Sequence, residues 1–198
     1  MFKMFLNVLN CDQKILSKAG LSLIKPNIFK DDRGYFFEAF NKARYNESIG
    51  DIDFIQDNES MSSKGVLRGL HYQFGEFAQS KLVRVIKGKV IDFALDIRKS
   101  SETFGHFFYV ELSGENKFQF FIPKGFAHGF LCLEDNTIFS YKCDNYWNKQ
   151  SERGIDLISY INFMKLNKII YLEDDITFLL SEKDKHYENI LNSNDLFS

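Results

Sequence analysis

A histidine and an arginine lie close together in GVLRGLHYQ, residues 65–73. Histidine is the side chain whose ordinary pKa is nearest neutrality, so His71 is a candidate general base. Arg68 presents a planar charged fork that suits a phosphate or a carboxylate. A histidine on a strand can also be a hydrogen-bonded structural residue. Gly65 and Gly69 favour a site here, because glycines beside a charged strand often mark the close approach of a ligand.

A second histidine, His128 in IPKGFAHGF, raises the question of a metal. The spacing of Pro123, Gly125 and His128 resembles the second motif of metal-binding cupin barrels. Such barrels usually add a His-x-His pair, and no second histidine lies near His71. With only four histidines in the chain, a three-histidine site is not expected, so we expect no metal. A metal-dependent cupin oxygenase or isomerase is the alternative.

Strand-like patterns dominate the first three quarters of the chain. Residues 81–98 alternate apolar and polar on both sides of Gly88, which predicts two half-buried strands joined by a tight turn. Short strands at roughly ten-residue spacing indicate an all-β sandwich or barrel. The 22 Phe suggest a wide, aromatic-filled interior. Further strands are predicted over 106–112, 117–122, 129–133 and 137–142, and short helices over 41–50 and 182–193.

Length and charge narrow the class of protein. A chain of 198 residues fits a single domain, residues 1–198. The net charge of −2 argues against a nucleic-acid binder, which needs a basic excess to neutralise phosphates. Three cysteines without paired or metal-type spacing indicate reduced thiols and a cytoplasmic protein. No apolar run approaches the ~20 residues of a membrane span, and no signal peptide is expected.

Several segments together resemble one known family. DDRGYFFE, GVLRGLHYQ, KLVRVIKGKVIDFALDIRKSSETFG and IPKGFAHGFLCLEDNT are similar, in the same order, to signatures of the dTDP-4-dehydrorhamnose 3,5-epimerases. These are metal-free cupins of deoxysugar biosynthesis. The resemblance covers about residues 22–150 and thins to SEKD, residues 181–184. It implies a cupin, or jelly-roll, double-stranded β-barrel with a few short peripheral helices.

The resemblance also implies a role for each matching residue. His71 corresponds to the family's catalytic base, and Asp184 to the carboxylate that orients it. Tyr141 corresponds to the tyrosine that returns a proton from the opposite face. Lys81 matches the lysine near the ketone oxygen. The residues that match substrate-binding positions are Arg33, Glu38, Gln56, Asn58, Arg68, His128 and Trp147.

The reaction that the resemblance implies needs only these side chains and no cofactor. It is epimerisation at carbon 3, carbon 5 or both of a nucleotide-linked 4-keto-6-deoxy sugar, through an enolate. For dTDP-4-dehydro-6-deoxyglucose the product is dTDP-4-dehydro-L-rhamnose. The family also implies a homodimer, in which exchanged N-terminal strands carry DRGYFFE to the partner's site.

Two departures from the family pattern keep alternatives open. The segment from about residue 155 lacks the family's tryptophans and its Trp-Pro pair. Trp147 places a large ring where a family aromatic lies against the sugar. The alternatives are a 3- or 5-epimerase of another nucleotide 4-keto sugar or keto-heptose, a sugar ketoisomerase, and a non-catalytic sugar-nucleotide-binding cupin.

Overall fold

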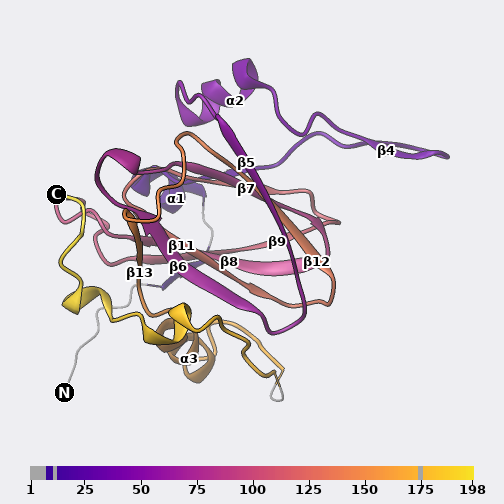
Figure 1. Ribbon diagram of the computed structural model, residues 1–198. Helices are drawn as coiled ribbons and strands as arrows, with labels where there is room; N and C mark the ends of the chain where they lie inside the picture. The colour runs from indigo at the N-terminus through magenta and orange to yellow at the C-terminus, as the bar shows by residue number, and fades with distance from the viewer. Residues whose placement is uncertain (1–7, 11–12, 174–175) are drawn as a thin grey trace.

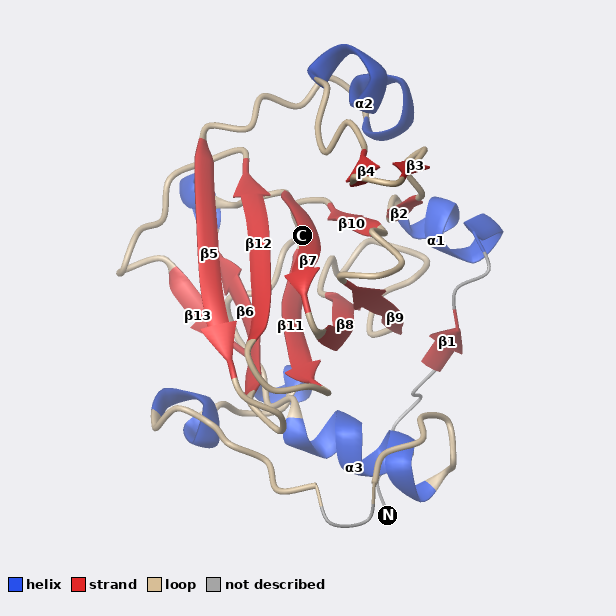
Figure 2. Cartoon of the chain, turned by 90° about the vertical axis from the view of Figure 1, so that its right-hand side faces the viewer, coloured by secondary structure: helices blue, strands red, loops and turns tan. Residues whose placement is uncertain are grey.

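The computed structural model describes residues 8–10, 13–173 and 176–198. Within these residues, two β-sheets face each other, and a small hairpin projects from the body they form (Figures 1 and 2). This two-sheet arrangement confirms the predicted all-β, jelly-roll architecture. In the described part of the chain, no helix has the length and apolar character that a membrane crossing requires.

The larger sheet runs in the order β1 (Val8–Asn10), β9 (Phe107–Ser113), β8 (Lys89–Asp96), β11 (Phe126–Cys132), β6 (Leu67–Gln73) and β13 (Glu152–Gly154). The smaller sheet runs in the order β2 (Ser22–Ile24), β10 (Gln119–Ile122), β7 (Lys81–Lys87), β12 (Thr137–Cys143) and β5 (Gln56–Ser62). The hairpin consists of β3 (Phe29–Asp31) and β4 (Gly34–Phe36).

Short helices lie around these sheets. The α-helices are α1 (Gln13–Ala19), α2 (Lys42–Ile49) and α3 (Ile158–Leu166). The 3-10 helices are η1 (Gly75–Phe77), η2 (Lys183–His186) and η3 (Ile190–Asn192). Helix α2 confirms the helix predicted over 41–50, and its N-terminus is capped by the side chain of Asn41. The prediction of one helix over 182–193 is wrong. Only the short 3-10 helices η2 and η3 form there, because the backbone between them is extended at Tyr187.

Strand β8 shows how the pleat builds two cores. Val90 and Ala94 face the smaller sheet, whereas Phe93 and Leu95 belong to a second cluster that includes residues of α3. The prediction that this strand is half-buried is therefore wrong, because helix α3 covers the face that would otherwise meet solvent. Each large apolar side chain buried in this way stabilises the fold by roughly 1.5–3 kcal/mol.

The predicted turn at Gly88 is present, but it does not join two paired strands. Strand β7 belongs to the smaller sheet and β8 to the larger one, so the chain changes sheets at this glycine. The turn at residues 134–136 likewise leads from β11 to β12 in the opposite sheet. These crossings place consecutive segments on opposite walls of the interior.

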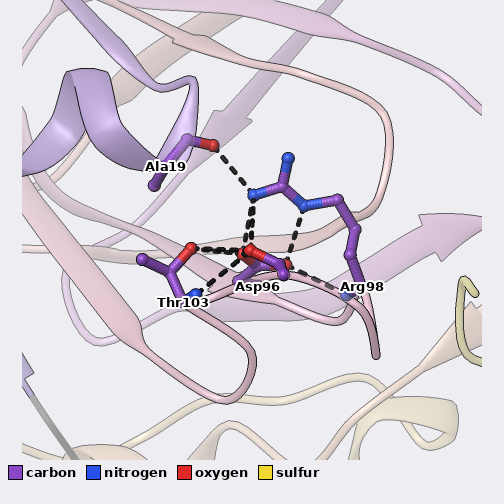
Figure 3. Close-up of polar contacts among 5 residues, drawn as sticks. Ala19, Asp96, Arg98 and Thr103 are labelled. Atoms are coloured by element: carbon purple, nitrogen blue, oxygen red, sulfur yellow. Dashed lines mark hydrogen bonds and ion pairs between the residues drawn. The ribbon is translucent and has the colours of Figure 1, made fainter.

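A buried carboxylate fixes the loop after β8 (Figure 3). Asp96 accepts hydrogen bonds from Nε and Nη2 of Arg98, and from the hydroxyls of Ser101 and Thr103. Arg98 Nη2 also donates to the carbonyl of Ala19, 2.9 Å away, at the end of α1. Burial acts to raise the pKa of Asp96, but these hydrogen bonds outweigh it and the net shift is downward. The ionised carboxylate therefore ties α1 and this loop to the larger sheet.

Replacing Asp96 with asparagine should cost about 2–4 kcal/mol of unfolding free energy at neutral pH, since Arg98 loses a buried partner. The folded pKa of Asp96 lies below its ordinary value. Its contribution is therefore complete above about pH 4 and is lost as the pH falls through the folded pKa. Urea unfolding at pH 7 and pH 3 should show a smaller difference between wild type and variant at pH 3. Equal stability at pH 7 would contradict this account.

Candidate active site

A cavity of about 860 Å³ lies between the two sheets, at the end where β5, β6 and β13 stand. Its walls come from both sheets and from the C-terminal segment. Nine of the eleven predicted site residues line it: Gln56, Asn58, Arg68, His71, Lys81, His128, Tyr141, Trp147 and Asp184. The structure thus brings together residues from six separate stretches of the sequence.

An irregularity in β6 lets both Arg68 and His71 face the cavity. Residues three apart in a regular strand point to opposite faces of the sheet. The pairing of β6 with β11 shifts its register between His71, opposite His128, and Arg68, opposite Phe130. Strand β6 therefore has one residue more than β11 over this stretch, which is a β-bulge. The bulge changes which face of the sheet the next side chains point to, so that both side chains point to the same face. Both side chains consequently line the cavity.

The glycines of this segment allow close approach of backbone, rather than of a ligand as predicted. A Cβ on Gly69 would lie 2.6 Å from the Cα of Gly129 in the neighbouring strand. A Cβ on Gly65 would lie 2.2 Å from the carbonyl oxygen of Thr177. Both glycines also have positive φ angles, which side chains rarely tolerate. Their role here is to let the strands and the C-terminal segment pack.

His71 is held by a carboxylate from the far end of the chain. Nε2 of His71 lies 2.5 Å from Oδ1 of Asp184, which is buried in η2. Burial acts to raise the pKa of Asp184, but the hydrogen bond and charge of His71 outweigh it, so the pKa is lowered. Asp184 is therefore ionised at neutral pH and fixes one ring nitrogen. The other ring nitrogen, Nδ1, takes no part in this contact with Asp184.

The smaller sheet supplies two further titratable groups. Lys81 opens β7, and its Nζ lies 3.5 Å from the carbonyl oxygen of His71. Burial lowers the pKa of Lys81, while the charges of Cys143, Asp92 and Glu152 oppose that effect. Burial raises the pKa of Tyr141, on β12, to about 12. Tyr141 is thus a neutral phenol that can donate a proton.

His128 lies in the wall with a partner that the sequence analysis missed. Its Nε2 lies 2.9 Å from Oδ2 of Asp92, and both side chains are buried. Burial lowers the pKa of His128, and Asp92 acts in the opposite direction. Among the residues that the structure describes, no three His, Cys, Asp or Glu side chains are placed to hold a metal ion.

The arrangement suits proton transfer on both faces of one bound molecule. His71 comes from the larger sheet and Tyr141 from the smaller one, and both line the same cavity. A base on one wall and a protonated acid on the other is the minimum that inversion of a carbon centre requires. Lys81 lines the same cavity and contacts the main-chain carbonyl of His71, and a cation there can stabilise negative charge on an oxygen of a bound molecule.

Comparisons with known proteins identify the family of the chain. The family model for dTDP-4-dehydrorhamnose 3,5-epimerase matches residues 16–192. The chain belongs to the dTDP-4-dehydrorhamnose 3,5-epimerase family. It is therefore an isomerase by family, as the resemblance of its motifs predicted.

Individual relatives extend over most of the chain. The dTDP-4-dehydrorhamnose 3,5-epimerase of Methanothermobacter thermautotrophicus is 45% identical over 169 residues, which are 85% of this chain and 89% of the relative. The Shigella flexneri enzyme is 54% identical over 134 residues, 67% of this chain and 74% of its own. The epimerase of Legionella pneumophila, solved with dTDP-4-keto-L-rhamnose, has a TM-score of 0.79 at 44% identity. That match covers 88% of this chain and 90% of the Legionella chain.

Two predicted residues of this epimerase-family site lie outside the cavity. Arg33 is on the β3–β4 hairpin, which projects away from the sheets (Figure 1), and it pairs with Asp31. Glu38 follows the hairpin and pairs with Arg44 at 3.0 Å. Within one chain, the structure therefore does not bring Arg33 and Glu38 to the other site residues, because the hairpin extends outward.

Other cavity residues were missed by the sequence analysis. Glu152, on β13, accepts a hydrogen bond from the indole N–H of Trp147 at 2.8 Å and another from Lys183. Burial acts to raise the pKa of Glu152, but these hydrogen bonds outweigh it and lower the pKa. The sequence around Glu152 does not distinguish it from an ordinary solvent-exposed glutamate. Its hydrogen-bond partners lie before β13 and in the C-terminal segment, and only the fold brings them together. Gln73, Gln79 and Tyr146 also line the cavity and were not predicted as site residues, although Gln73 ends the GVLRGLHYQ segment.

Proposed function

We propose that this chain inverts carbons 3 and 5 of dTDP-4-dehydro-6-deoxyglucose, giving dTDP-4-dehydro-L-rhamnose. The observation that carries the proposal is the His71–Asp184 pair, at 2.5 Å, in a cavity whose opposite wall holds Tyr141. Carbons 3 and 5 both flank the ketone at carbon 4, so each can lose its proton to give an enolate. The ligand of the Legionella relative is the product of this reaction.

The chemistry proceeds as two proton transfers at each carbon. Nδ1 of His71 takes the proton, and the electrons of the C–H bond move to the ketone oxygen to form the enolate. Asp184 stabilises the resulting imidazolium and holds the ring in one orientation. Lys81 donates to the enolate oxygen, which is worth several kcal/mol in comparable sites. Tyr141 then gives its phenolic proton to the other face of the carbon, and both groups reset by proton exchange.

The remaining cavity residues would hold the substrate. Arg68 supplies a guanidinium for the diphosphate, and its Nε already donates to Ser62 at 3.2 Å. Gln56 and Asn58 hydrogen-bond each other at 3.1 Å on alternate positions of β5, where amides can recognise the nucleotide. His128, fixed by Asp92, supports the wall beside the sugar. Trp147 is 53% exposed at the cavity, and its ring would pack against the sugar.

Arg33 and Glu38 would serve a second copy of the chain in a homodimer. The hairpin that carries Arg33 exposes Phe29 and Phe36, at 65% and 71% of their surface. Exposed aromatics on a projecting hairpin favour burial against another chain. The exchange would bring Arg33 and Glu38 to the partner's cavity.

The cytoplasmic location expected from the cysteines stays a prediction.

Proton NMR of the reaction in deuterated water tests the proposed function. We expect deuterium at both carbon 3 and carbon 5 of the product, because each proton is removed and replaced from solvent. Deuterium at one carbon would assign a single-site epimerase, and a shifted carbonyl would assign a ketoisomerase. No turnover of any 4-keto-6-deoxy nucleotide sugar would contradict the proposal and favour a non-catalytic binding protein.

Mixing two impaired variants tests the exchanged hairpin. His71→Asn removes the base, and Arg33→Ala with Glu38→Ala removes the proposed contribution of the hairpin. If the hairpin serves the partner, a mixed dimer has one intact site, so unfolding and refolding an equal mixture should restore activity to about a quarter of the sites. Activity no greater than the average of the separate variants would contradict the exchange.

A further inference from the structure

His71 has a second neighbour besides Asp184. The ring of Tyr187 meets the imidazole edge-to-face, with centroids 5.7 Å apart and planes at 75°. Tyr187 follows Asp184 by three residues, so one short segment makes both contacts. Edge-to-face packing is favourable and directional, and it therefore restricts how an imidazole can rotate.

Gly154 makes room for the Tyr187 ring. In the pairing of β13 with β6, Gly154 lies directly opposite His71. Side chains of directly opposed residues stand side by side on one face of a sheet. A Cβ on Gly154 would lie 2.3 Å from two ring carbons of Tyr187. Tyr187 thus takes the place that a cross-strand neighbour of His71 would otherwise fill.

The segment around Tyr187 is anchored to the body of the protein. The backbone N–H of Asp156 donates to the carbonyl of Glu188 at 3.0 Å, next to the end of β13. Ile190 is 7% exposed and belongs to the core cluster that includes α3. Burial, with the charges of Glu152 and Asp184, raises the pKa of Tyr187 to about 12. Tyr187 is consequently neutral at physiological pH, as Tyr141 is, but unlike Tyr141 it does not line the cavity.

We propose that Tyr187 is a positioning residue, which holds the imidazole of His71 against Asp184 in the notch that Gly154 leaves open. Tyr187 does not line the cavity, so it acts through His71 and not on the substrate. Its consequence for turnover rests on the proposed function. Its consequence for the His71–Asp184 hydrogen bond can be observed without any substrate.

Kinetics of two variants at position 187 separate the ring from the hydroxyl. Tyr187→Ala should lower kcat roughly tenfold to a hundredfold, with KM within about twofold, because a misplaced base slows the chemical step. Tyr187→Phe keeps the ring and should stay near wild type. Unchanged kcat in Tyr187→Ala, or equal losses in both variants, would overturn the proposal.

Two control variants show whether a loss of kcat is specific to the Tyr187 ring. Tyr171→Ala makes the same chemical change at a side chain that is 97% exposed. Phe197→Ala loosens the same C-terminal segment, since Phe197 packs on Tyr72 and Phe74 and makes no ring contact with His71. Both should keep wild-type kcat. A loss in Phe197→Ala as large as in Tyr187→Ala would assign the effect to the segment as a whole and overturn the proposal.

Substitution of Gly154 tests the notch itself. Gly154→Ala should impair kcat because the new Cβ displaces the Tyr187 ring. In the double variant with Tyr187→Ala the obstacle is gone, so kcat should be no lower than in Tyr187→Ala alone. If the fold-losses in kcat of the two single variants multiply in the double variant, Gly154 and Tyr187 act independently. That result would overturn the proposal that Gly154 makes room for the Tyr187 ring.

NMR of ¹⁵N-histidine protein without substrate distinguishes this proposal from the proposed function. The hydrogen-bonded imidazole N–H of His71 should give a protected signal in wild type and Tyr187→Phe, and exchange faster with solvent in Tyr187→Ala. That pattern in a chain without epimerase activity would refute the proposed function and support the positioning. An unchanged signal in Tyr187→Ala would refute the positioning, whatever the turnover.

Discussion

The hydrogen bond between His71 and Asp184 joins residues 113 positions apart in the sequence, and much of the structure serves to make it. His71 needs β6 to sit between β11 and β13 in the larger sheet. Asp184 needs the C-terminal segment to return to the start of β6 after α3, where Leu179 pairs with Val66. The apolar cluster beneath α3, which also contains Ile190, holds the two parts together. A carboxylate buried without its histidine would be costly, so the pair and the fold support each other.

The division of the sandwich interior explains how a rigid core and an open site coexist. Near β8, the space between the sheets is filled by side chains such as Val90 and Ala94 on one wall and Phe120 on the other. Toward β5 and β13, the same inward-facing positions carry polar side chains, and a cavity remains. Strand β11 spans both regions, with Cys132 in the core and His128 in the cavity wall. The candidate catalytic groups thus stand on strands whose other residues are fixed by packing.

Local patterns in the sequence predict the strands well, because alternation reports which face of a strand is buried. They predict the partners of those strands poorly. The turn at Gly88 is recognisable from the residues, yet nothing local says that the chain crosses to the other sheet there. The irregularity in β6 that aligns Arg68 with His71 depends on the register with β11, which is also a long-range property. Burial of β8 on both faces depends on α3, more than sixty residues later.

In the candidate site, too, the sequence predicts what is local and misses what depends on long-range contacts. His71 and Arg68 stand out by residue type and spacing, whereas Asp184 was expected only through the family resemblance, across a divergent stretch of sequence. Asp92, Glu152 and Tyr187 carry no local signal, because each acquires its meaning from a partner brought close by the fold. The opposite holds for Arg33 and Glu38: the motif around them is recognisable from the sequence, but in a single chain they do not line the cavity.

The central claim is that His71 removes a proton and Tyr141 returns one to the opposite face. Solvent deuterium exchange into the 4-keto sugar nucleotide, measured beside inversion in His71→Asn and Tyr141→Phe, tests this division most directly. We predict that Tyr141→Phe continues to exchange the proton with little inversion, and that His71→Asn does neither. Exchange that persists in His71→Asn would contradict the account.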